Sequence, residues 1–156
     1  MAIRNIRTDD APILRKVSKE VKELDDRVIE LLDDLIQTMH EAQGVGLAAV
    51  QVGVLKRVVV IDVGEGLIEL INPKILSTKG EQIEEEGCLS LPGLCGKVKR
   101  PAVVKVEALN RKGEKFELEG RELLARAICH ELDHLEGVLF KDKVVEFIDI
   151  KQGEVR

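Results

Sequence analysis

The feature that most constrains this chain is the pentapeptide at residues 130–134, which reads HELDH and holds two of the three histidines. In a helix, residues four apart lie one turn from each other on the same face, about 5 to 6 Å apart at Cβ. His130 and His134 are therefore spaced to bind one metal ion. Glu131 is turned about 100° around the helix, so it is placed to reach a metal-bound water, as in H-E-x-x-H sites. An amphipathic helix whose histidines happen to share a face is the competing interpretation.

Such a helix needs a folded domain around it, and the chain is long enough to supply one. Its 156 residues are 44% hydrophobic and 34% charged, which favours one folded catalytic domain over residues 1–156 and argues against disorder. Trp and Tyr are absent and only three Phe occur. The core must therefore consist mainly of Leu, Ile, Val and Ala.

The charge balance and the N-terminal residues restrict the partners and the location. With 24 basic and 29 acidic residues the net charge is -5, which argues against a protein that binds nucleic acid through its phosphates. No long apolar run follows the first basic residues, so neither a signal peptide nor a membrane span is expected, and a cytoplasmic location is predicted. Three cysteines, an odd number, favour reduced thiols over disulfide bonds.

Hydrophobic periodicity predicts a mixture of helices and strands. From Asp25 to Gly44, apolar residues recur at helical spacing, with an aspartate available at the N-cap. Strands are predicted at 58–61, 67–71, 102–109 and 116–119, with a break at Asn72-Pro73 and a turn at 110–113. Gly120 and Arg121 are expected to open the helix that carries HELDH, and Gly137 to close it. The predicted fold class is α+β, with mainly antiparallel strands packed around this central C-terminal helix.

A segment of small residues at 44–53, GVGLAAVQVG, follows the first predicted helix. Small residues let another backbone approach closely, although a tight helix-to-strand connection under the core would have the same composition. Gln51 is the lone polar residue in this apolar setting, and a buried polar side chain needs a partner. It is therefore a candidate to donate a hydrogen bond to a ligand.

A catalytic zinc-type site needs about three protein ligands and one open position. The third ligand could be Cys88, Cys95, Cys129, His40 or a carboxylate. Cys129 points about 100° away from His130 on the helix and is interpreted as a core cysteine. His40 lies in the last turn of its predicted helix, where a cation suits the helix dipole. Cys88 is favoured over Cys95 because its glycine neighbour gives it room.

Three segments together resemble the three motifs of the bacterial peptide deformylase family. They are GVGLAAVQ at 44–51, EGCLS at 86–90 and HELDH at 130–134, in the same order and at roughly the same spacing. The resemblance extends from the arm DAPILR at 10–15 to GVLF at 137–140. It covers most of the chain.

The resemblance implies an enzyme that removes the formyl group from the N-terminal formyl-methionine of new chains and releases formate. By position, one divalent metal would be held by Cys88, His130 and His134. The family uses Fe²⁺, while Zn²⁺, Ni²⁺ or Co²⁺ can occupy the same ligands. Glu131 would act as general base and acid, and the Gln51 amide and the Leu89 backbone N–H would form an oxyanion hole.

The resemblance also implies the partners and the way in which the substrate is held. N-formyl-methionyl nascent peptides would lie extended beside Gly44, Val45 and Gly46. The methionine would enter an apolar pocket, for which Val45, Leu123 and Ala127 are candidate walls, although core packing explains them equally well. Transient association with the ribosome is expected, without a direct nucleic-acid site and without a membrane.

Two departures from the family and two other functions have to be considered. Cys129 stands where family members commonly have Gln, and many have an arginine near the position of Cys95, which bears on how residues beyond methionine are held. A zinc endopeptidase shares H-E-x-x-H but normally takes a downstream His or Glu as its third ligand, and no histidine follows His134. A non-catalytic metal-binding domain normally has four protein ligands.

Overall fold

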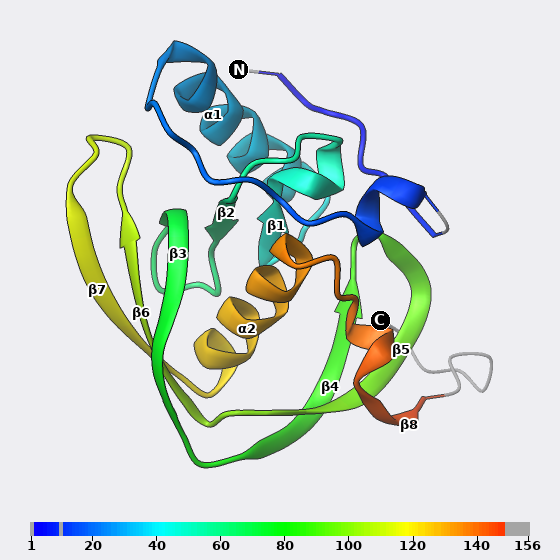
Figure 1. Ribbon diagram of the computed structural model, residues 1–156. Helices are drawn as coiled ribbons and strands as arrows, with labels where there is room; N and C mark the ends of the chain where they lie inside the picture. Colours follow the sequence, from blue (N-terminus) through cyan, green and yellow to red (C-terminus); the bar gives the residue numbers. More distant parts are fainter. Residues whose placement is uncertain (1, 10, 149–156) are drawn as a thin grey trace.

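In the computed structural model, which describes residues 2–9 and 11–148, antiparallel strands surround a buried helix (Figure 1). Within those residues the α-helices are α1 (Asp26–Glu41) and α2 (Leu123–Leu135). One sheet, in the order β1-β2-β3-β6-β7, contains Gly46–Ala48, Val58–Ile61, Ile68–Lys79, Val103–Leu109 and Lys115–Arg121. The other, in the order β4-β5-β8, contains Gln82–Cys88, Leu91–Arg100 and Val144–Phe147. These strands all pair antiparallel, so the predicted α+β class is confirmed.

Helix α1 forms where the apolar periodicity predicts it. Its N-terminus is capped by Asp25, whose carboxylate accepts the N–H of Val28 at 3.1 Å, so one of the unpaired N–H groups of the first turn is satisfied. Its apolar face buries Val28, Leu31, Leu32, Leu35 and Met39. This face packs against Val58 and Val60 of β2, which fixes α1 to one side of the β1-β2-β3-β6-β7 sheet.

Helix α2 lies on the other side of the same sheet. In β2, Val59 and Ile61 point to the opposite face of the sheet from Val58 and Val60, because the side chains of a strand alternate. They pack in a hydrophobic cluster with Ile128 of α2. Figure 1 shows α2 between this sheet and the β4-β5-β8 sheet. Because protein surrounds the helix, even the polar residues His130 and Glu131 are buried. Among the described residues, no helix combines the length and the apolar character needed to cross a bilayer.

The predicted break at Asn72-Pro73 is wrong, because β3 runs through it. The pairing with β6 shifts register between Ile71 and Lys74, so the two residues form an irregularity within the strand. Asn72 has a φ of 52°, and its side chain exchanges hydrogen bonds of 2.8 and 2.9 Å with the main chain of Val21. A segment some fifty residues earlier therefore supports a conformation that the local sequence would not hold in a strand.

The predicted helical start at Gly120 and Arg121 is also wrong, because both residues belong to β7. The helix begins after Glu122, which has a φ of 54° and turns the chain from the sheet edge into α2. A Cβ at Gly120 would lie 2.8 Å from the side chain of Ile128. Glycine here serves the close contact between β7 and α2, and it does not mark a helix boundary.

Residues near the start of the chain pack against the end of α2 at Gly137. This glycine has a φ of 74° and follows the helix end as predicted, and a Cβ on it would collide with the main chain of Arg15. The Arg15 guanidinium donates to the Gly137 carbonyl at 3.4 Å and to Asp142 at 3.1 Å. Ser18 donates its N–H to the Leu135 carbonyl at 2.8 Å, so the early arm is part of the packed structure.

Candidate metal centre and active site

The structure brings together Cys88, His130 and His134. One ligand atom of each lies within 4.8 Å of the others, and the Cys88 Sγ is 3.4 Å from the His134 Nε2. Cys88 ends β4, and the two histidines lie one turn apart on α2, with ring centroids 5.1 Å apart. The group predicted from the helical spacing and the upstream cysteine is thus assembled from two different parts of the fold.

The donor set fits a divalent metal ion. The Nδ1 of His130 lies 2.9 Å from the Glu86 carboxylate, which leaves its Nε2 for a metal, the pattern that metal-binding histidines usually show. Burial lowers the pKa of His134 well below its usual value, so this ring is neutral, the form that binds metals. One thiolate and two imidazoles leave a coordination position for water or substrate, as catalytic sites do.

Glu86 is the centre of a buried ion-pair network that sequence reasoning missed. Its carboxylate accepts from Arg100 at 2.8 and 2.9 Å and from Arg126, and all three side chains are buried. Burial alone would raise the pKa of Glu86, but the hydrogen bonds from Arg100 and His130 outweigh it and lower the pKa to about 2. Glu86 is therefore ionised and able to hold the His130 ring. Arg100 also reaches Asp133 at 2.6 Å, which ties the far side of α2 to β5.

Glu131 lies beside the metal group with little else in contact with its carboxylate. The side chain is 4% exposed, and its Oε1 has no hydrogen-bond partner among the described residues. Burial raises the pKa of Glu131 to about 7, the range that suits a group that accepts and returns protons at neutral pH. A Cβ at Gly46 would lie 2.5 Å from its Oε2. The glycine therefore makes room for the carboxylate where β1 meets α2.

Gln51 has the partners that its buried position requires. It lies in the short 3₁₀ helix η2 (Ala49–Val52) and is 1% exposed. Its Oε1 accepts the N–H of Ala48 at 3.0 Å. Its Nε2 donates to the Ser90 Oγ at 3.1 Å and lies 3.6 Å from the Cys88 Sγ. The side-chain amide thus faces the same space as the metal group.

One cavity joins these groups to the predicted substrate residues. Its volume is about 560 Å³, within the usual range for ligand sites. The predicted residues that line it are Gly44, Val45, Gly46, Gln51, Cys88, Leu89, Leu123, Ala127, His130 and Glu131. Val45 and Leu123 are about half exposed, whereas Ala127 is buried. The side chain of Leu89 occupies the space that a Cβ at Gly44 would need, at 2.7 Å.

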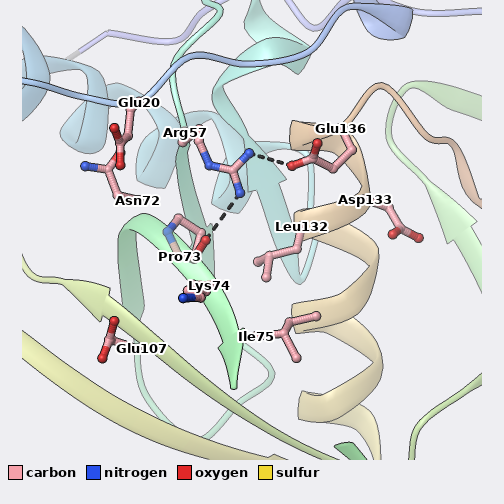
Figure 2. A pocket seen from close by; sticks show the side chains of 10 residues that line it. All are labelled: Glu20, Arg57, Asn72, Pro73, Lys74, Ile75, Glu107, Leu132, Asp133 and Glu136. Atoms are coloured by element: carbon pink, nitrogen blue, oxygen red, sulfur yellow. Dashed lines mark hydrogen bonds and ion pairs between the residues drawn. The ribbon is translucent and has the colours of Figure 1, made fainter. Parts of the chain in front are cut away.

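A second cavity of similar size, about 640 Å³, lies on another side of α2 (Figure 2). Figure 2 shows Arg57 between Glu136 and Pro73, and its guanidinium donates to the Glu136 carboxylate at 2.6 Å and to the Pro73 carbonyl at 3.3 Å. None of the predicted site residues lines this cavity. Size alone therefore does not identify the candidate site.

The remaining candidates for the third ligand lie outside the metal group. Cys129 is buried, and burial raises the pKa of its thiol to about 11, as expected of a core cysteine. Cys95 is buried in β5. His40 lies 3.4 Å from Asp62 on the surface. Sequence reasoning also missed the contact made by Ser90. This residue stands in the EGCLS motif at residues 86–90, but its partner, Gln51, is 39 residues away in the chain.

Comparisons with known proteins agree with this geometry. The family model described as polypeptide deformylase matches residues 3–148. A peptide deformylase of Acetivibrio thermocellus is 65% identical over 156 residues, which is 100% of this chain and 92% of that protein. A second, of Alkaliphilus metalliredigens, is 64% identical over 146 residues, 94% of this chain and 99% of that protein.

Solved structures agree as well. The crystal structure of the peptide deformylase from Thermotoga maritima has a TM-score of 0.90 and 40% identity, covering 92% of this chain and 99% of that one. The structure of a peptide deformylase from Synechococcus elongatus in complex with actinonin has a TM-score of 0.88 and 42% identity, covering 90% and 78%. The likeness thus extends over most of the chain.

Proposed function

The chain belongs to the polypeptide deformylase family, and from this premise we propose how its own residues remove the formyl group from newly made peptides. It is a metal-dependent peptide deformylase, which hydrolyses the N-formyl group and releases formate. The observation that carries the mechanism is the buried Glu131 carboxylate beside the group of Cys88, His130 and His134. Family membership removes the two competing functions, a zinc endopeptidase and a non-catalytic metal-binding domain.

Cys88, His130 and His134 would hold one divalent ion, with Fe²⁺ as the physiological metal and Zn²⁺, Ni²⁺ or Co²⁺ able to replace it. When bound, the ion supplies Lewis acidity, which lowers the pKa of water and polarises the formyl oxygen. Glu86 orients the His130 ring through the contact at Nδ1. The thiolate of Cys88 makes the site softer and more sensitive to oxidation than a set of nitrogen ligands would be.

Glu131 moves the proton in this mechanism. Its carboxylate takes a proton from the attacking water while the water oxygen bonds to the formyl carbon. When the carbon–nitrogen bond breaks, Glu131 gives a proton to the departing amine, and formate leaves. Burial raises the pKa of Glu131 above its usual value, so this carboxylate holds a proton more readily than an exposed one and can return it to the amine.

Gln51 and Leu89 stabilise the negative oxygen of the tetrahedral intermediate. The Gln51 Nε2 and the Leu89 backbone N–H would donate to it, and both residues line the cavity. Donors of this kind lower a barrier by about 3 kcal/mol. They are held in place before the substrate arrives, so no reorganisation is needed during the reaction.

The substrate peptide would lie extended along Gly44, Val45 and Gly46, with its methionine in the cavity beside Leu123 and Ala127. This arrangement is supported by the position of all five residues along one cavity. The whole chain, residues 1–156, would act as one catalytic domain in the cytoplasm. It would meet N-formyl-methionyl nascent chains during transient association with the ribosome, without contacting nucleic acid or membrane.

The test is formate release from formyl-Met-Ala-Ser by anaerobically prepared protein of measured metal content. Glu131→Gln should keep its metal and lose activity by about a hundredfold or more, because it removes the proton acceptor. Glu136→Gln, at an exposed position at the C-terminal cap of the same helix, is the matched control and should retain activity. Normal turnover by metallated Glu131→Gln would exclude Glu131 as the base. Failure of metallated wild type to release formate would refute the proposal that formyl-methionyl peptides are the substrate.

A further inference from the structure

Ser90 places a hydroxyl directly beside the Gln51 side-chain amide. The residue follows Cys88 and Leu89 in the turn between β4 and β5 and is fully buried. Its Oγ accepts a hydrogen bond from the Gln51 Nε2 at 3.1 Å. The two residues are 39 positions apart in the sequence, so the contact exists only in the folded enzyme.

The hydrogen bonds of Gln51 fix which way its amide points. The oxygen must face Ala48, because the backbone N–H there donates to it at 3.0 Å. The nitrogen therefore faces the opposite way, with two N–H groups to place. One donates to the Ser90 Oγ, and Nε2 also donates to the Cys88 Sγ at 3.6 Å, which directs the second N–H toward the metal group, where the formyl oxygen would bind.

We propose that Ser90 is a positioning residue that holds the Gln51 amide with one N–H directed at the formyl oxygen. The terminal torsion of a glutamine side chain is broad and poorly restrained on its own. A hydroxyl acceptor on one side and a backbone donor on the other restrict it to one orientation. This inference rests on the proposed function, in which Gln51 stabilises the oxyanion.

The main chains of both residues are held by other contacts, so the hydroxyl is not needed to keep the two segments together. Arg7 donates its N–H to the Gln51 carbonyl at 2.6 Å, and Asp9 donates its N–H to the Ser90 carbonyl at 2.7 Å. One short stretch of the N-terminal arm thus fixes η2 and the β4–β5 turn from outside. Removing the Ser90 hydroxyl should leave these contacts intact and release only the rotation of the amide.

The test is a double-mutant cycle with formyl-Met-Ala-Ser, measured on samples of equal metal content. Ser90→Ala should lower kcat about tenfold, the effect of losing one hydrogen bond, with little change in KM. Gln51→Leu should lower kcat about a hundredfold. The double variant should match Gln51→Leu, because Ser90 acts only through that side chain. Ser18→Ala removes another buried serine hydroxyl, one without a hydrogen-bond partner among the described residues, and should keep the wild-type kcat.

The outcomes separate the inference from the proposed function. If Gln51→Leu slows turnover but Ser90→Ala does not, or if the two losses multiply in the double variant, the role of Ser90 is overturned and that of Gln51 stands. If Gln51→Leu leaves kcat unchanged, the proposed role of Gln51 fails and the inference fails with it.

A spectroscopic measurement tests the same contact without turnover. In zinc-loaded protein, the side-chain amide resonances of Gln51 can be identified by their loss in Gln51→Leu. They should move in Ser90→Ala and stay in place in Ser18→Ala, and unmoved resonances in Ser90→Ala would overturn the proposal. If Ser90→Ala fails to fold, Ser90→Cys keeps the shape of the side chain, with a somewhat larger atom that is only a weak acceptor. It should also move the resonances, and unmoved resonances in Ser90→Cys would likewise overturn the proposal.

Discussion

At the scale of single residues, Glu86 shows how one buried carboxylate can serve two purposes. It pairs with Arg100 and Arg126 and contacts the Nδ1 of His130. Removing one partner of a buried ion pair leaves the remaining charge buried and unpaired, which lowers the free energy of unfolding. The same carboxylate therefore contributes to stability and to the orientation of a proposed metal ligand.

The low pKa of Glu86 predicts a specific dependence of stability on pH. Its folded value, about 2, lies below the ordinary 4.5, so the ionised group stabilises the fold fully above pH 4.5. This contribution is lost as the pH falls from 4.5 to 2. In metal-free protein, the free energy of unfolding of wild type should fall across that window by on the order of 3 kcal/mol more than that of Glu86→Gln.

Urea unfolding at a series of pH values measures this difference. Glu84→Gln, an exposed position on the same strand, should keep the wild-type dependence. Parallel curves for wild type and Glu86→Gln would show that the ionisation of Glu86 is not linked to folding.

The part of the site that helical spacing alone predicts is the histidine pair. His130 and His134 share a helix, so their spacing alone places them on one face. The contacts of Glu86 with His130 and of Gln51 with Ser90 span 44 and 39 residues. No local pattern marks such pairs, because the long-range packing of β4 against α2 and η2 creates them.

At the scale of elements, helix α1 depends on its cap and on its apolar face. Asp25→Ala removes the acceptor for the Val28 N–H and should lower the free energy of unfolding by about 1 kcal/mol. Asp26→Ala changes the next residue, which lies inside the helix, and should have a smaller effect. Urea unfolding compares them, and equal losses would mean that helix dipole effects, not the cap, dominate.

Helix α1 and the β6–β7 hairpin could be predicted because their periodicities of 3.6 and 2 are carried by their own residues. The course of β3 could not, since Asn72 is held by Val21 and not by its neighbours. The start of α2 was missed for a related reason. Position 120 requires glycine because Ile128 packs closely against it. In the sequence, a glycine needed for such a contact looks the same as a glycine at a helix boundary.

At the scale of the whole molecule, the proposed metal would link the two sheets. Cys88 comes from the β4-β5-β8 sheet, and the histidines come from α2, which packs on the β1-β2-β3-β6-β7 sheet. A ligand that binds only the folded state stabilises it by RT ln(1 + L/Kd), where L is the free ligand concentration, an amount that rises with the logarithm of that concentration. The metal should therefore act on the stability of the fold as well as on the reaction.

Removing the metal with a chelator should lower the Tm. At free metal a hundredfold above its Kd, the stabilisation is about 2.7 kcal/mol, which corresponds to roughly 5 to 10 °C for a chain of this size. Cys88→Ser should lose much of this difference, whereas Cys95→Ser should keep it. Calorimetry with and without metal measures the effect. A full difference in Cys88→Ser would remove Cys88 from the ligand set.

The contact of Gly137 with Arg15 also has a consequence for how the enzyme is made. A ribosome synthesises the chain from its N-terminus, so the arm emerges first, and its partners in and after α2 are joined 122 residues later. Until then Arg15 and Ser18 lack their partners at the end of α2, and the two histidines do not yet exist. Assembly of the site must therefore wait until α2 has been synthesised, so an enzyme that acts on nascent chains gains its own active site only after this helix is made.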